Sequence, residues 1–150
     1  MNKNLKNKVL ARVMILALMG MAVAGCGKYD KISVLGEWTI DLKEAKGLNV
    51  EYATETLCFE SGSKQDYSEV HLERAVGSGS GGNRTDWVIK GNFERKNNKI
   101  TFSNRVKEAT GEQMTTVTYK YRIEGDKLIL IIEGEGFKNN EKIYIKKEGF

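Results

Sequence analysis

The stretch VTYKYRIEGDKLILII, residues 117–132, decides the fold of this chain. Apolar side chains recur at every second position on both sides of Gly125-Asp126, which is the pattern of two half-buried strands. Glycine and aspartate suit the two central positions of a tight hairpin, where the backbone needs positive φ. A turn at this dipeptide sets Ile123 opposite Leu128. The stretch therefore predicts an antiparallel hairpin with one apolar face.

The same alternation at period two runs through most of residues 35–150 and predicts eight strands, with no helix longer than a turn or two. The runs that carry it are 38–42, 57–59, 70–76, 87–93, 100–106, 117–123, 128–132 and 143–145. Tight turns at Asn97-Asn98 and Asn139-Asn140 join two further strand pairs, because asparagine tolerates positive φ.

These turns also predict a register, which decides the side of the sheet that each side chain faces. Asn97-Asn98 sets Phe93 opposite Phe102 and Ile89 opposite Val106. A turn centred on Ser63-Lys64 places Leu57 opposite Val70. In the last strand, Ile143 and Ile145 are expected to face inward.

Connection lengths favour a closed barrel over a sandwich. The first, third and fifth connections are long (residues 44–50, 77–83 and 107–114), whereas the fourth and sixth are two residues each. In an up-and-down barrel, odd connections share one rim and even connections share the other. The expected fold is thus all-β, an eight-stranded antiparallel up-and-down β-barrel with the long loops at one mouth, preceded by a signal-peptide helix. Its interior has room for side chains and at most one small ligand.

Residues 1–25 have the anatomy of a secretory leader. Four basic residues precede an apolar run over residues 13–24 and a small-residue site. The run is too short to cross a membrane as a helix, which needs roughly 20 residues. The segment Val23-Ala24-Gly25-Cys26 resembles the lipobox of bacterial lipoproteins, which implies cleavage before Cys26 and acylation of its thiol; a plain secretory peptide with a chance cysteine is the alternative. We expect a leader (1–25), a lipidated tether (26–34) and a barrel (35–150), anchored in the bacterial cell envelope.

Charge and cysteine content narrow the partners further. The chain carries 24 Lys and Arg against 20 Asp and Glu, but four of the basic residues belong to the leader and the first acidic residue is Asp30. The remaining residues are balanced, which argues against nucleic acid as a partner. With Cys26 acylated, Cys58 has no cysteine partner within the chain.

The barrel resembles the lipocalin-like (calycin) domain of bacterial lipoproteins. Gly36-Glu37-Trp38 matches the G-x-W motif that opens the first strand of that family. The resemblance implies that Trp38 plugs the closed end and that a basic residue of the last strand lies across its ring. Lys147 fits that role on the expected parity, with Lys146 as the alternative.

Inward parity near the wide mouth brings several polar side chains together. Glu55 and Arg74 are expected to face each other inside the barrel, with Trp87, Asn104 and Tyr119 at similar depth. A few polar groups among apolar walls can orient a ligand. The alternative is an internal ion pair that satisfies itself, or a bulge that breaks the local parity.

The remaining motifs give weaker evidence for catalysis or cofactor binding. Cys58, Glu69 and His71 are expected on the outer face of one hairpin, where no pocket or oxyanion donor supports a nucleophile. We therefore expect neither an enzyme nor a bound metal or other cofactor. The glycine-rich run at residues 77–82 spells G-x-G-x-x-G, but a strand follows it where a dinucleotide site needs a helix.

Two functions follow from these features. One is a lipid-anchored barrel that holds a small apolar or amphipathic ligand at its mouth. The other is an envelope interaction or structural module whose barrel is filled by its own aromatic side chains, Trp38, Phe59, Phe93, Phe102 and Tyr121. Space above Tyr119 and Trp87 favours the ligand, whereas a packed mouth favours contact with an envelope protein.

Overall fold

The computed structural model describes residues 27–61, 65–77, 79, 83–132 and 136–149. The predicted leader and Cys26 lie outside these residues. In the described part of the chain, the one α-helix is short, and no helix is long and apolar enough to cross a membrane.

The protein is an antiparallel β-barrel, as the sequence predicted. Eight strands form a closed ring, and β6 is a short addition that pairs only with β5. The elements are β1 (Gly36–Asp41), α2 (Leu42–Lys46), β2 (Val50–Ser61), β3 (Gln65–Ala75), β4 (Arg84–Lys96), β5 (Lys99–Lys107), β6 (Glu112–Met114), β7 (Val117–Glu124), β8 (Lys127–Ile131), η1 (Lys138–Asn140) and β9 (Glu141–Lys146).

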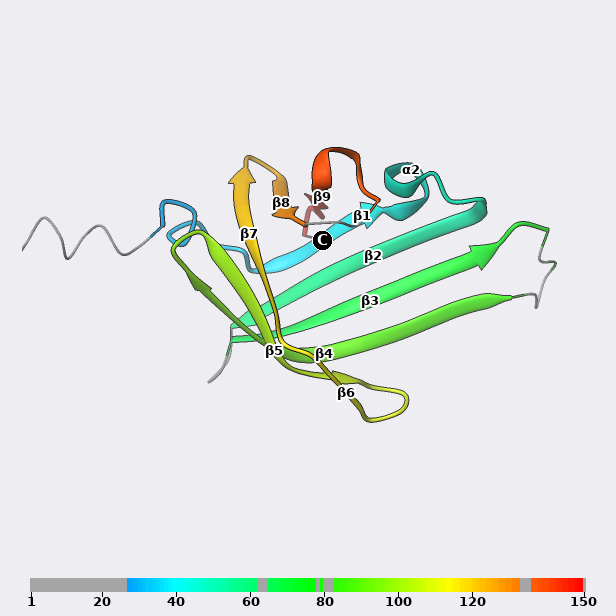
Figure 1. Ribbon diagram of the computed structural model, residues 1–150, viewed down its shortest axis with the longest axis horizontal. Coiled ribbons are helices and arrows are strands. Elements are labelled where there is room, and N and C mark those ends of the chain that lie inside the picture. The colour runs from blue at the N-terminus through cyan, green and yellow to red at the C-terminus, as the bar shows by residue number, and fades with distance from the viewer. Residues whose placement is uncertain (1–26, 62–64, 78, 80–82, 133–135, 150) are drawn as a thin grey trace, which may run out of the picture.

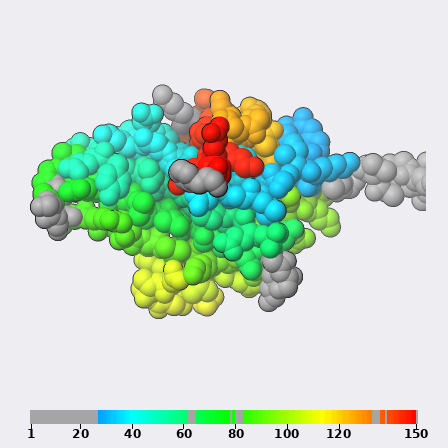
Figure 2. Space-filling model, turned by 180° about the vertical axis from the view of Figure 1, so that it is seen from behind, coloured from blue at the N-terminus to red at the C-terminus, as the bar shows by residue number. Residues whose placement is uncertain are grey.

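The strands differ in length, which gives the barrel two unlike ends (Figure 1). The long strands β2, β3 and β4 extend past the short β8 and β9, and α2 lies beside this extension. We call this the open end. The opposite end, at the tight β4–β5 and β7–β8 turns, is the closed end. The β6 hairpin, yellow in Figure 2, projects from the wall of the barrel.

Two of the predicted hairpins have the expected register next to their turns. Ile123 pairs with Leu128 across the Gly125-Asp126 turn, and Phe93 pairs with Phe102. Asn97 and Asn98 both have φ of 56°, which is the left-handed backbone that this tight turn requires. Local turn chemistry was sufficient to predict both.

The β2–β3 hairpin is shifted by one residue from the prediction. Leu57 pairs with Glu69 instead of Val70, and the last pair before the connection is Ser61 with Gln65. Since a one-residue shift exchanges the two faces of a strand, Glu69 and His71 face into the barrel. Their predicted position on the outer face is wrong.

The predicted register of β5 is wrong at its far end, because the strand contains a bulge. Ile89 pairs with Lys107 instead of Val106, because two residues of β5 occupy the space opposite Gly91. Asn104 is the bulged residue, with φ of 50°. Its side chain bonds Asn92 on the outside, and Arg105 turns inward in its place. Gly91 permits this approach, since a Cβ there would lie 2.6 Å from the Ser103 carbonyl oxygen.

The last strand also has the opposite parity to that expected. Its pairing with β8 sets Leu128 opposite Tyr144, so Tyr144 is buried and both Ile143 and Ile145 are exposed. The predicted two-residue turn at Asn139-Asn140 is wrong: β8 already ends at Ile131, and both asparagines belong to η1, directly before β9. The longer connection allows β9 to pair in another register.

The G-x-W segment closes one end of the barrel. Trp38 is 1% exposed, and its indole Nε1 donates a hydrogen bond of 2.7 Å to the Val34 carbonyl. The Lys146 ammonium lies 5.4 Å from the centre of the indole ring. Lys147 instead forms an exposed ion pair with Glu37. The basic residue over the tryptophan is therefore Lys146, because β9 has the shifted parity.

Residues that the sequence presents as a tether pack against the closed end. Asp30 accepts hydrogen bonds from the Tyr121 hydroxyl (2.7 Å) and the Gly27 amide (2.9 Å). The Tyr29 amide donates to the Asn98 side chain, and Arg95 donates to the Ile32 carbonyl. The chain is thus held to the barrel from Gly27 onward.

Candidate functional site: an internal charge network

The closed-end half of the barrel interior is aromatic and the open-end half is charged. Five aromatic side chains pack in the first half with ring-centre separations of 4.4–6.4 Å where they contact; they are Phe59, Tyr67, Phe93, Phe102 and, at the edge, Tyr119. Above them, acidic, basic and hydroxyl groups from β2, β3, β5 and β9 meet inside the wall. We refer to these groups as the charge network.

Glu55 is the most deeply buried charge in the network, with 2% of its surface exposed. One carboxylate oxygen accepts a hydrogen bond from the Tyr144 hydroxyl, and the other lies 2.8 Å from the Lys142 ammonium. His71 Nδ1 is 3.8 Å from the second oxygen. The position of Glu55 follows from alternation in β2, between the buried Ala53 and Leu57.

Glu69 forms the second half of the network. Its Oε1 lies 2.5 Å from His71 Nε2, and its Oε2 accepts a hydrogen bond of 3.3 Å from Arg105. Arg105 also donates to the Tyr67 hydroxyl and to the Thr115 carbonyl. His71 therefore lies between two carboxylates, each of which has its own cationic partner.

The network changes the acidity of its members. Burial acts to raise the pKa of the Glu69 carboxyl, but the hydrogen bond and charge of His71 and the charge of Arg105 hold that pKa below its usual value. Burial raises the pKa of Tyr67 to about 12. Burial also raises the pKa of Tyr144 well above 10, and the Glu55 carboxylate adds to this effect. Both tyrosines thus remain hydrogen-bond donors at neutral pH.

Glu55, Glu69 and His71 together offer ligand atoms within 4.8 Å of one another, close enough to surround a metal ion. The same carboxylates already contact Lys142 and Arg105. A divalent cation would have to displace or oppose these two positive charges. The geometry therefore favours ion pairs over metal coordination.

The space left within the network is small. A cavity of about 30 Å³ is bounded by side chains that include Glu55, Glu69, Arg105 and Tyr119. That is on the order of the space of one water molecule. Towards the mouth, the Trp87 ring stacks on His71 with ring centres 4.5 Å apart and planes 7° apart. Where the described side chains bound it, the interior is packed.

The residues predicted for a ligand site separate into two groups. Glu55 and Tyr119 line the cavity, and Trp87 covers His71. Arg74 does not meet Glu55; it forms an ion pair with Glu51 at 3.0 Å and bonds the Gly79 carbonyl. Asn104 faces outward because of the bulge. The predicted pair of Glu55 and Arg74 is replaced by Glu55 and Lys142.

Sequence reasoning did not place Glu69, His71, Arg105, Lys142 and Tyr144 inside the barrel. The last two stand at inward positions only after the shift in β9, and His71 only after the shift in β3. Cys58 remains on the outer face, apart from His71. Burial raises the pKa of its thiol, which is opposite to the activation of a nucleophile.

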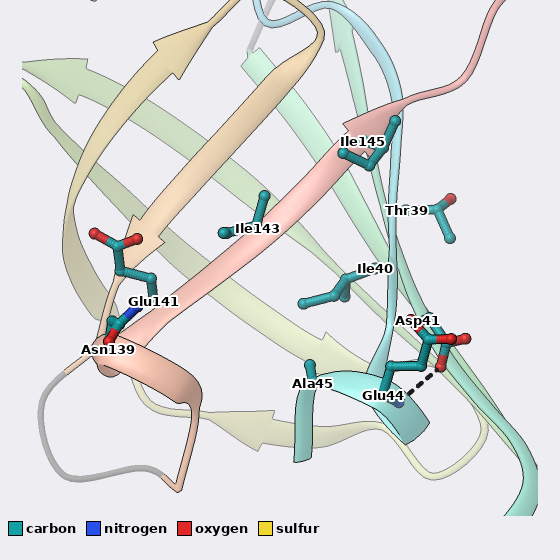
Figure 3. A pocket seen from close by; sticks show the side chains of 9 residues that line it. All are labelled: Thr39, Ile40, Asp41, Glu44, Ala45, Asn139, Glu141, Ile143 and Ile145. Atoms are coloured by element: carbon teal, nitrogen blue, oxygen red, sulfur yellow. Dashed lines mark hydrogen bonds between the residues drawn. The ribbon is translucent and has the colours of Figure 1, made fainter. Parts of the chain in front are cut away.

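A second feature lies outside the barrel, where β1 and β9 diverge. The two strands pair at only two positions, Trp38 with Lys146 and Thr39 with Ile145. Beyond these pairs, a groove of about 420 Å³ opens between β1, α2 and β9. Figure 3 shows Ile143 and Ile145 along one side and Ala45 of α2 on the other. The two isoleucines are 41% and 42% exposed.

The rim of this groove is acidic. Asp41 caps α2 through the Lys43 and Glu44 amides, and Glu141 pairs with Arg122 at 2.7 Å. Glu44 adds a third carboxylate. The groove thus combines an apolar floor with carboxylates at its edge.

Comparison of the chain with protein-family models, curated proteins and solved structures gave no match. The resemblance to lipocalin-like lipoproteins consequently remains a prediction from the G-x-W segment and the barrel.

Proposed function

We propose that the protein is a lipid-anchored β-barrel of the bacterial cell envelope that acts as an interaction module through its outer surface. The observation that carries this proposal is the charge network. Its two carboxylates are paired with cations of the chain itself, and the cavity beside them has room for about one water. A barrel that is filled by its own side chains presents its outside to partners.

The anchor is supported by the leader pattern and the cysteine at position 26. Feeding cells an alkyne-bearing fatty acid and labelling the purified full chain tests it. We expect label on the wild-type protein and none on Cys26→Ser, whereas Cys58→Ser should remain labelled. Label that persists in Cys26→Ser would refute the anchor.

The groove at the β1–β9 divergence is the surface that we propose for a protein partner. Exposed isoleucines in a concave site are a common feature of interaction surfaces, and the acidic rim suits a segment with apolar and basic residues. A photo-crosslinking amino acid at position 143, in the full chain in its host, should give one product of defined mass. The control position is Lys90 of β4, on the far side of the ring. Equal products from both positions would contradict the proposal.

A small ligand at the mouth is the second candidate, and one observation favours it. The Trp87 ring covers His71 at the open end, where a flat molecule can stack on the half-buried indole. Native mass spectrometry of the full chain released from host membranes separates the two functions. A co-purifying small molecule that is lost in Trp87→Ala supports the ligand, and a bare protein supports the filled barrel.

A further inference from the structure

The closed end carries a row of lysines on its outer face. Lys96 pairs with Lys99 across the β4–β5 turn, and Lys99 pairs with Lys120 of β7. All three side chains are exposed, because their strand neighbours Arg95, Ile100 and Tyr121 face inward. Three like charges therefore stand side by side on three adjacent strands.

This arrangement is unfavourable for the isolated barrel. Like charges directly opposite each other destabilise a sheet. In the described part of the chain, the lysines that form ion pairs are Lys90, Lys142 and Lys147, none of which belongs to the row. Glu94 shares the outer face of β4 but forms no ion pair with the row. An anionic surface would offset this repulsion, because it attracts clustered lysines.

The row lies beside Gly27, where the segment that follows the proposed anchor contacts the barrel. Asn98, between Lys96 and Lys99, bonds the amide of Tyr29 and lies so close to Gly27 that a Cβ there would come within 2.3 Å of it. Gly27, the residue that follows Cys26 in the sequence, is thus in contact with the β4–β5 turn. In Figure 1 the blue segment that begins at Gly27 lies at the tip of the β4–β5 hairpin.

We propose that the row of Lys96, Lys99 and Lys120 binds the anionic headgroups of the membrane that holds the acyl chains, which sets the closed end against the bilayer and points the open end away from it. The exposed Lys28 and Lys31 lie on the segment beside the row and add to its charge. The inference rests on the proposed anchor at Cys26. It names phospholipid headgroups as the partner of this end of the barrel.

The test uses the acylated full chain, with its acyl chains verified by mass, in vesicles of phosphatidylcholine alone or with 30 mol% phosphatidylglycerol. A fluorophore at Thr118→Cys, in a Cys58→Ser background, reports contact through quenching by a spin label on the lipid headgroup. A second variant carries the fluorophore at Thr110→Cys, on the exposed connection between β5 and β6. We expect phosphatidylglycerol to increase quenching at residue 118 by about twofold or more and to leave residue 110 unchanged.

The matched comparison is between two triple variants with equal net charge. Lys96→Gln, Lys99→Gln and Lys120→Gln together should abolish the effect of phosphatidylglycerol, whereas Lys43→Gln, Lys90→Gln and Lys107→Gln should retain it. The first triple should unfold at the same or a higher urea concentration than wild type, since it removes like-charge repulsion. High salt should likewise abolish the effect of phosphatidylglycerol on quenching in the wild-type protein, because it screens exposed charges.

The outcomes separate the two proposals. The proposed role of the lysine row is refuted if phosphatidylglycerol does not change the quenching of the acylated protein. It is also refuted if both triple variants respond equally to this lipid. Neither result contradicts the proposed anchor. A chain isolated from its host without acyl chains on Cys26 overturns the anchor and the inference that rests on it.

Discussion

The two ends of the barrel each hold a carboxylate that accepts a hydrogen bond from a tyrosine hydroxyl, but they differ in the other partners. At the open end, Glu55 is bonded by Tyr144 and Lys142, which are side chains of β9. At the closed end, Asp30 is bonded by Tyr121 and by the backbone amides of Gly27 and Asn98. The first arrangement joins strands across the interior, and the second holds a terminal segment to a turn.

Removal of Glu55 should have the largest effect. Glu55→Ala leaves Lys142 and the buried Tyr144 hydroxyl without their acceptor, and we expect the free energy of unfolding in urea to fall by about 3–5 kcal/mol. Glu51→Ala is the control, because it removes an ion pair with Arg74 that is far more exposed and should cost less than about 1 kcal/mol. Equal costs for the two variants would show that burial does not matter here.

The bulge that turns Arg105 into the network depends on Gly91. In Gly91→Ala, the new methyl group would lie 2.6 Å from the Ser103 oxygen and 2.9 Å from the Tyr67 ring. We expect a loss of about 2–3 kcal/mol in the same urea measurement. Gly79→Ala, where no atom lies within 4 Å, should change stability by less than about 0.5 kcal/mol. A tolerated alanine at position 91 would contradict the described bulge.

Loss of Asp30 should weaken the closed end without opening the network. Asp30→Ala removes bonds to a tyrosine hydroxyl and two amides, and we expect it to cost about 2 kcal/mol. Hydrogen exchange should quicken more at the amides of Tyr29 and Asn98 than at that of Tyr144, because the lost bonds hold the closed end. In Asp66→Ala, an exposed carboxylate on β3 is lost, and these amides should keep their wild-type exchange.

Acid should act on both ends in the same direction. Burial opposes ionisation of Asp30, yet its hydrogen bonds with Tyr121 and the amides of Asn98 and Gly27 lower its pKa, as His71 and Arg105 do for Glu69. A lowered pKa stabilises the fold fully above the unfolded pKa of about 4 and loses that effect as the pH falls through the folded pKa. Stability measured against pH should fall below about pH 4. The fall should be shallower in Asp30→Asn and in Glu69→Gln, and an unchanged slope would contradict it.

The smallest expected effect concerns the cation over Trp38. Lys146→Gln should cost about 0.5–1 kcal/mol and alter tryptophan fluorescence. Lys147→Gln removes only an exposed ion pair with Glu37 and should cost less than this. If Lys147→Gln cost more than Lys146→Gln, Lys147 would be the basic residue over Trp38 that the family resemblance implies.

The sequence was sufficient for the fold wherever a local signal existed. Alternation and the turns at Asn97-Asn98 and Gly125-Asp126 predicted strands and pairings that the structure confirms. Prediction of the site depended on which face of its strand each side chain occupies. A shift of one residue in the register exchanges the two faces. The bulge at Asn104 and the long connection before β9 carry no local signal in one sequence, because tertiary packing decides them. Glu55 and Tyr119 were placed correctly inside, since each lies in an undisturbed part of its strand.

The narrow pairing between β1 and β9 also sets the order of events in folding. The ring closes only when Trp38 meets Lys146, near the two extremes of the barrel sequence. Such distant contacts make barrel formation slow, typically in milliseconds to seconds. The chain contains no proline, so peptide-bond isomerisation adds no later phase. Closure of this seam is therefore the step that should limit the rate of refolding, and until it occurs the edges of β1 and β9 are open to other strands.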